Sequence, residues 1–161
     1  FGFSIGTYTG QNLGAKRSDL SMLYAKICLR IAAVFALIIA TFVVILRFPL
    51  ASLFINANTP DAALVINIAA QTLIVVAILQ PAQMSSVVLA GSLRGAGDNL
   101  YVASRMALCV SILRPLLTFI AVSVFHFSLA MTWLLSMSEI FIRFYFFYNR
   151  FKGGLWKEKR V

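Results

Sequence analysis

The stretch AALVINIAAQTLIVVAILQPAQMSSVVLAGSL runs from residue 62 to residue 93 without Asp, Glu, Lys or Arg. Its 32 residues exceed the roughly 20 that an α-helix needs to cross the hydrocarbon core of a bilayer. Residues 115–138 form a second stretch of 24 residues, in which His126 is the only titratable side chain. Residues 31–46 form a third, of 16 residues, which flanking basic side chains can lengthen because their stems reach back to the interface. We interpret all three stretches as membrane-crossing helices.

The composition of the whole chain agrees with a membrane protein. Of its 161 residues, 61% are hydrophobic and 12% are charged, whereas soluble domains have roughly 45–50% and about 25%. Such a chain would expose large apolar patches in water. Disorder, a coiled coil and collagen are excluded by the same figures, and a soluble enzyme is disfavoured.

We therefore predict an all-α, polytopic membrane helix bundle with four complete transmembrane helices and the end of a fifth. The incomplete helix lies at residues 1–13, which are too few to cross a bilayer. The complete helices lie at about 22–48, 61–91, 104–126 and 129–149, and a basic tail follows at 150–161. Because the chain opens inside an apolar run without Met, we expect it to be part of a longer protein.

The basic residues predict the orientation of these helices. Eleven of the 14 fall on one side of the predicted membrane part, while the opposite loops offer only Arg47. By the positive-inside rule this side, with the C-terminus, is cytoplasmic, which fits a multi-pass protein of the plasma membrane. Orientation in a lipid bilayer thus accounts for the net charge of +9, and no nucleic-acid partner is expected. The eleven residues are Lys16, Arg17, Lys26, Arg30, Arg94, Arg105, Arg150, Lys152, Lys157, Lys159 and Arg160.

The residues do not form a pattern typical of an enzyme. Cys28 and Cys109 fall inside predicted spans, where a disulfide is neither needed nor expected. His126 stands alone at the outer end of a helix, and no set of side chains has the spacing of a metal site or a hydrolytic triad. We expect no enzymatic activity, no metal and no cofactor.

The long central helix carries polar residues at mid-depth. Gln80 and Gln83 flank Pro81, which removes one backbone hydrogen bond. Amide side chains in hydrocarbon turn towards a protein interface or a wet cavity. We predict that these three residues line a substrate cavity, with helix packing as the alternative.

Two opposite charges are expected to meet in the membrane. Arg114 and Glu139 lie equally far along the chain from a turn near His126, so an antiparallel hairpin places them at the same depth. Pairing offsets much of the cost of a buried arginine, roughly 2.5–3.5 kcal/mol on insertion scales. Arg143, one turn after Glu139, is a competing partner. The pair is interpreted either as a structural lock or as a contact that rearranges during transport.

Three segments resemble the multidrug and toxic-compound extrusion (MATE) family. Gly10–Arg17, GQNLGAKR, resembles the segment that closes the second helix of each half in that family. Gly91–Asp98, GSLRGAGD, resembles its loop after the fourth helix of a half, and Arg150–Lys157, RFKGGLWK, resembles its terminal tail. The residues that the resemblance assigns to cytoplasmic loop motifs are Gly10, Gln11, Gly14, Gly91, Arg94, Gly95, Gly97 and Asp98.

The resemblance implies a transporter with twelve helices in two lobes. Residues 1–149 would be a partial C-terminal lobe, from the end of helix 8 to helix 12, whose partner is the missing N-terminal lobe of the same chain. Members of the family export small cationic or amphipathic compounds by antiport, with alternating access driven by protons or sodium. The sodium-coupled members carry an acid at the position of Gln83, and an amide cannot supply that charge. Proton coupling is therefore preferred, with the coupling ion bound mainly outside this segment.

Two other functions stay open. A lipid-linked oligosaccharide flippase of the same superfamily would have the same topology with another cargo. A membrane assembly subunit that does not transport a compound would share only its apolar composition with a transporter.

Overall fold

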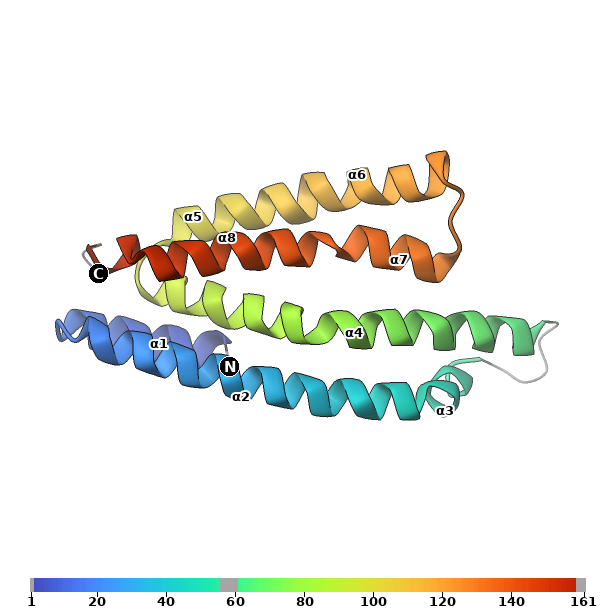
Figure 1. Ribbon diagram of the computed structural model, residues 1–161, viewed down its shortest axis with the longest axis horizontal. Coiled ribbons are helices and arrows are strands. Elements are labelled where there is room, and N and C mark those ends of the chain that lie inside the picture. Colours follow the sequence, from blue (N-terminus) through green and yellow to red (C-terminus); the bar gives the residue numbers. More distant parts are fainter. Residues whose placement is uncertain (1, 56–60, 159–161) are drawn as a thin grey trace.

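The computed structural model describes residues 2–55 and 61–158, and these are helical with short connections and no strand. This confirms the predicted all-α fold of a polytopic membrane protein (Figure 1). The first elements are α1 (Gly2–Gly14), α2 (Ser18–Ile45), α3 (Arg47–Ser52) and the long α4 (Ala62–Gly95). They are followed by α5 (Asn99–Met106), the π-helix η1 (Ala107–Leu113), α6 (Arg114–Phe119), the π-helix η2 (Ile120–Val124), α7 (Leu129–Met137), α8 (Glu139–Gly153) and the 3₁₀-helix η3 (Leu155–Glu158).

In the described part of the chain, 4 helical stretches are long and apolar enough to cross a membrane. They are Ser18–Ile45, Ala62–Gly95, Asn99–Val124 and Leu129–Gly153. At most 28% of the residues in their apolar windows are buried inside the protein. Large side chains such as Phe42 and Ile45 point outward, being 61% and 69% exposed. Their outward apolar surface suits contact with lipid.

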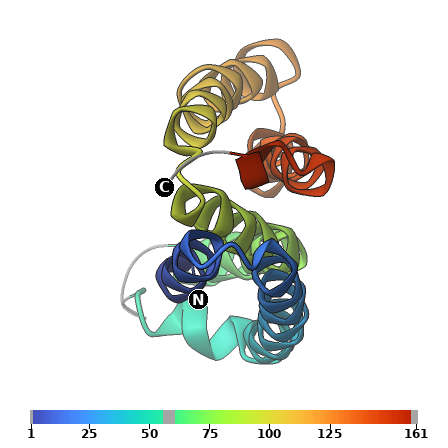
Figure 2. The same cartoon turned by 90° about the vertical axis from the view of Figure 1, so that its left-hand side faces the viewer.

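The helix α4 is the centre of the arrangement. It packs against α1 and α2 on one side and against α7 and α8 on the other (Figures 1 and 2). The buried core includes Ala25 and Ala32 of α2, Leu89 and Leu93 of α4, and Phe147 of α8. The residues that α2 buries are all small, which lets this helix approach its neighbours closely.

The helices end at residues that differ from several predicted boundaries. α4 continues to Gly95, beyond the predicted end at residue 91, and the next helix begins at Asn99 rather than near residue 104. Glycine is unfavourable in the interior of an isolated helix. Packing of α4 against α1 outweighs that preference and leaves only residues 96–98 as a connection.

The residues expected in cytoplasmic loops therefore lie mainly in helices. Gly10, Gln11 and Gly91 also fall within the predicted helices at 1–13 and 61–91, whereas Arg94 and Gly95 lie in α4 because that helix runs on past residue 91 while packed against α1. The structure places Gly10, Gln11 and Gly14 in the last turns of α1, and Gly91, Arg94 and Gly95 in the last turns of α4. Gly97, at a φ of +81°, and Asp98 lie in the connection to α5.

The basic tail also begins later than predicted. α8 extends to Gly153, and Gly154, at a φ of +74°, reverses the chain. This turn lets Trp156 fold back onto Phe151, with ring centroids 5.2 Å apart and the indole Nε1 donating to the Phe151 carbonyl at 2.8 Å. Trp156 is fully buried. The predicted tail residues 159–161, like Phe1 of the first predicted helix, lie outside the described residues.

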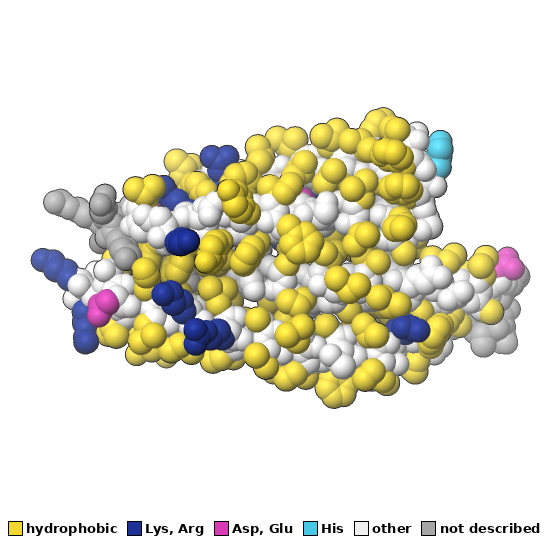
Figure 3. Space-filling model, in the orientation of Figure 1, with side chains coloured by type: hydrophobic (Ala, Val, Ile, Leu, Met, Phe, Trp, Pro, Cys, Tyr) yellow, Lys and Arg dark blue, Asp and Glu magenta, His cyan; other side chains and the backbone are white. Residues whose placement is uncertain are grey.

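Basic side chains gather at one end of the bundle. This end holds the turn from α1 to α2, the turn from α4 to α5 and the end of α8 (Figures 1 and 3). Arg47, at the start of α3, lies at the other end. The uneven distribution of charge is thus a property of the folded molecule as well as of the sequence.

Candidate functional site

The polar site lies where α4, α6 and α8 meet. Arg114 opens α6 directly after the π-helix η1, and its backbone N–H donates to the carbonyl of Cys109, five residues earlier. Pro115 lacks an N–H and crowds the preceding turn, which favours this wider register. A π-turn shifts the helix face that follows it and is frequent at functional sites. Here it sets the direction of the Arg114 side chain.

The structure brings Arg114 and Glu139 together. One terminal nitrogen of the Arg114 guanidinium donates to Glu139 Oε1. The Glu139 side chain is fully buried, whereas that of Arg114 is 29% exposed. The hairpin that allows this contact turns at residues 125–128, where His126 has a φ of +50°. A buried carboxylate thus faces a cation on the neighbouring helix.

Arg143 joins the same cluster from α8. Its Nε lies 3.9 Å from Glu139 Oε2, and its side chain is 4% exposed. A terminal nitrogen of Arg143 donates to Gln83 Oε1 on α4. The sequence predicts Arg143 as a competitor for Glu139, and the structure shows it bridging Glu139 and Gln83. The contact with Gln83 was missed, because residue spacing gives the depth of a side chain but not its direction.

Gln80 and Gln83 line one cavity of about 230 Å³ beside this cluster. The two glutamines are three residues apart on α4, so they share a helix face. Pro81 does not line this cavity. It is rotated by about 100° from Gln80 and borders a separate cavity of about 320 Å³ against α2. The lining of the first cavity is Val76, Leu79, Gln80, Gln83, Arg114, Trp133, Met137 and Ile140.

A smaller cavity of about 80 Å³ lies on the other side of Gln83. It is bordered by Ser86 and Ala90 of α4 and by Arg143 and Phe147 of α8. The Ser86 hydroxyl and the Arg143 Nε are buried and have no hydrogen-bond partner. Gln83 therefore lines both cavities, and its side-chain oxygen accepts a hydrogen bond from Arg143.

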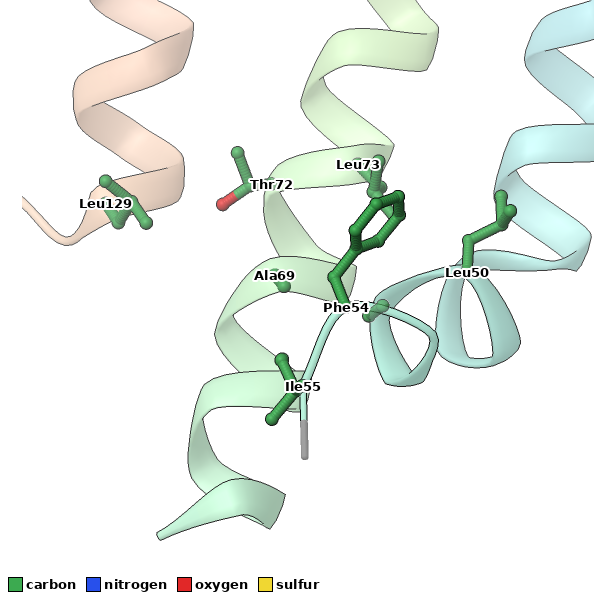
Figure 4. Close-up of a pocket in the computed structure, with 8 residues that line it drawn as sticks. Leu50, Phe54, Ile55, Ala69, Thr72, Leu73 and Leu129 are labelled. Atoms are coloured by element: carbon green, nitrogen blue, oxygen red, sulfur yellow. The ribbon is translucent and has the colours of Figure 1, made fainter. Parts of the chain in front are cut away.

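A larger cavity of about 530 Å³ lies near the end of the bundle opposite the basic residues (Figure 4). It is formed by α3, α4 and the start of α7, with Phe54 and Ile55 on one side and Leu129 on the other. Among its lining residues, Thr72 alone has a polar side chain. Without a charge or an amide, this cavity has nothing to recognise a charged compound.

The glycines of α1 and α4 form a close helix crossing on the opposite side of α4. A Cβ added to Gly91 would lie 2.1 Å from the carbonyl oxygen of Gly2, and one on Gly95 would lie 2.0 Å from that of Gly6. A Cβ on Gly10 would lie 2.9 Å from the Gly95 oxygen. Backbones approach this closely only where side chains are absent. We call these five residues the glycine crossing.

A second arginine–carboxylate pair joins α8 to the connection after α4. Arg150 Nε donates to Asp98 Oδ2 at 2.7 Å, and Asp98 is fully buried. The Arg150 guanidinium also lies 4.8 Å from the centre of the Tyr101 ring. This pair was not predicted from the sequence. The available signal was that both family-like segments, at 91–98 and at 150–157, were predicted at the same end of the bundle.

Arg94 borders the cavity of about 80 Å³. It is exposed, and its guanidinium contacts the sulfur of Met106 at 3.0 Å. In residues 2–55 and 61–158, no group of three or more His, Cys, Asp or Glu side chains is placed to hold a metal ion.

The comparisons with known proteins concern most of the chain. The family model described as MatE matches residues 1–120, which is well over half of the sequence. The comparisons with curated proteins and with solved structures gave no match.

Proposed function

The chain belongs to the MatE family of membrane transporters, and from this premise we propose that it is part of an exporter for cationic or amphipathic drugs and metabolites. The export is an antiport in which two lobes alternate in their opening to the two sides of the membrane. The chain supplies one wall of the central cavity, and an N-terminal lobe of the same protein supplies the other.

One observation carries this proposal: Gln80, Gln83 and Arg114 border a single cavity between α4 and the hairpin. Apolar side chains would pack these helices at lower cost, because amides and charges in hydrocarbon are expensive. Polar groups retained at such a place are typical of a transport pathway.

Proton coupling is preferred over sodium coupling. Gln83 is neutral, and the carboxylate of Glu139 is already in contact with Arg114 and near Arg143. A sodium ion would have to compete with two guanidinium groups for that carboxylate. The coupling ion is therefore assigned mainly to the part of the protein outside this chain.

The basic end of the bundle is assigned to the cytoplasmic face of the plasma membrane. The concentration of Lys and Arg there supports this orientation (Figure 3). Labelling of single cysteines placed at Lys152 and at Phe48 in intact cells tests it. An impermeant maleimide should label the Phe48 site, beside Arg47, and spare the Lys152 site.

Ethidium accumulation in cells that express the full-length protein tests the function. The protein should lower accumulation, and a protonophore should abolish the effect while removal of sodium should not. Gln80→Leu should reduce efflux, whereas Gln71→Leu, an exposed position on the same helix, should not. Strict sodium dependence would overturn the coupling assignment. Unchanged ethidium levels with a defect in cell-envelope polymers on deletion would instead favour the flippase, and no effect in either assay would favour the assembly subunit.

A further inference from the structure

The cluster of Arg114, Glu139 and Arg143 carries an excess positive charge. Arginine remains protonated in proteins, so the two guanidinium groups face a single carboxylate. The sequence contains one other acidic residue between positions 62 and 157, Asp98. That carboxylate is engaged by Arg150 at 2.7 Å. The helices from α4 to α8 therefore provide no carboxylate to balance the second positive charge of the cluster.

The cavity beside the cluster presents hydrogen-bond donors. Arginine can only donate, so the contact with Arg143 requires Gln83 to turn its carbonyl oxygen to that side. The NH₂ group of Gln83 is then left to donate elsewhere. Arg114, with a buried Nε that has no partner, borders the same cavity as Gln80 and Gln83. Donors and a net positive charge complement an anion.

The size of the cavity limits what it can hold. At about 230 Å³ it is smaller than the roughly 300–1,000 Å³ of sites that enclose a drug-sized ligand. It therefore suits one group of a larger compound rather than the whole molecule. The remaining walls, including Leu79, Met137 and Ile140, are apolar and suit the adjoining carbon skeleton.

We infer that this cavity is a subsite for an anionic group, a carboxylate, on the compounds that the exporter moves. The inference rests on the proposed export function and refines it: amphipathic compounds that carry a carboxylate beside a cationic ring are preferred over the same cations without it. Arg114 is the residue that contacts the carboxylate, while Arg143 and Gln83 hold the positive charge and the amide in place.

A matched pair of dyes tests the subsite. A rhodamine with a free benzoate and its methyl ester share one cationic ring system and differ only in the negative charge and one methyl group. Fluorescence polarisation with the purified full-length protein gives the Kd of each dye. The wild-type protein should bind the carboxylate dye about tenfold more tightly than the ester, as expected for one charge-assisted hydrogen-bonded contact.

Variants of the cluster should move this ratio in opposite directions. Arg114→Gln should bring the ratio close to one, while Glu139 keeps a cationic neighbour because Arg143 lies 3.9 Å away. Arg114→Lys should preserve most of the preference, because the charge is retained. Glu139→Gln should raise the ratio further, since it removes the competing carboxylate. Arg30→Gln, on the exposed side of α2, is the matched control and should leave the ratio unchanged.

Each outcome separates the subsite from the export function. Equal binding of the two dyes by the wild-type protein, or a preference that survives Arg114→Gln, would overturn the subsite and leave cation export standing. If Arg114→Gln does not fold, Glu139→Gln provides the test. A preference for the carboxylate dye that does not rise in Glu139→Gln would overturn the subsite. Binding of neither dye would contradict the subsite, and a lack of ethidium export would then contradict the proposed function as well.

Discussion

The two sides of α4 are held by opposite means. Towards α1, the glycine crossing brings backbone against backbone with no side chain between them. Towards α8, the buried Glu139 and Arg143 meet the half-buried Arg114 and Gln83 beside two cavities. At the crossing points there is no room for a Cβ, although a cavity of about 540 Å³ that Gly2, Gly6, Gly91 and Gly95 help to line lies beside them. The second contact depends on each charge keeping a partner. The α1 side of α4 therefore tolerates no side chain at the crossing, whereas the α8 side is sensitive to the loss of a charge.

Gly95→Leu should have the largest effect. Even a Cβ at this position would lie 2.0 Å from the Gly6 carbonyl oxygen, so α1 and α4 would have to separate. We expect loss of the folded, monodisperse full-length protein in detergent, measured by fluorescence-detected gel filtration. Gly153→Ala is the control, because a Cβ there meets nothing within 4 Å. Equal yields of the two variants would show that the crossing is looser than described.

Glu139→Leu should have the next largest effect. It leaves Arg114 and Arg143 without their carboxylate, and removal of one partner from a buried pair costs about 3–5 kcal/mol. Its thermal transition should fall well below that of the wild type. The double variant Arg114→Leu with Glu139→Leu should recover part of the loss, because one of the two stranded charges is removed. A double variant less stable than Glu139→Leu would argue against a direct pair.

Arg150→Gln should destabilise the protein to a smaller extent. It removes the Arg150 donor from the buried Asp98, and the loss of one hydrogen-bond partner by a buried polar group costs about 1–3 kcal/mol. The Arg150 side chain is 20% exposed, so water can replace part of the interaction. Lys152→Gln, exposed at the same end of α8, should leave the transition temperature unchanged. If both variants behave alike, the pair adds nothing beyond surface charge.

The smallest effects should come from two buried serines on the two sides of α4. Ser86→Ala removes a hydroxyl that has no partner, so stability should stay within about 0.5 kcal/mol of the wild type or rise. Ser21→Ala removes a hydroxyl of α2 that donates to the Thr9 carbonyl of α1 at 3.2 Å, which should cost about 1 kcal/mol. Chemical denaturation of both variants gives the comparison. If Ser86→Ala lost more stability than Ser21→Ala, the Ser86 hydroxyl would have a partner in the cavity that it shares with Arg143.

Much of the fold could be predicted because charge-free runs of sufficient length have few other structures available. The meeting of Arg114 and Glu139 followed from their equal distance to one turn. By contrast, Gly91 and Gly95 were assigned to a loop motif by resemblance, which does not indicate what either glycine packs against. Their role depends on Gly2 and Gly6, which are more than 80 residues earlier in the sequence.

The amino-acid sequence by itself determined that this chain is a helical, polytopic membrane protein and that Arg114 and Glu139 lie equally far from one turn. The distance of a residue from a turn follows from a rise of about 1.5 Å per residue and needs no knowledge of the neighbouring helices. Only the tertiary structure decided that Pro81 faces away from Gln80, that Gln83 meets Arg143, and that Asp98 meets Arg150. Those contacts depend on the rotation of each helix about its axis, which close packing and a π-turn set and which spacing along a single chain does not contain.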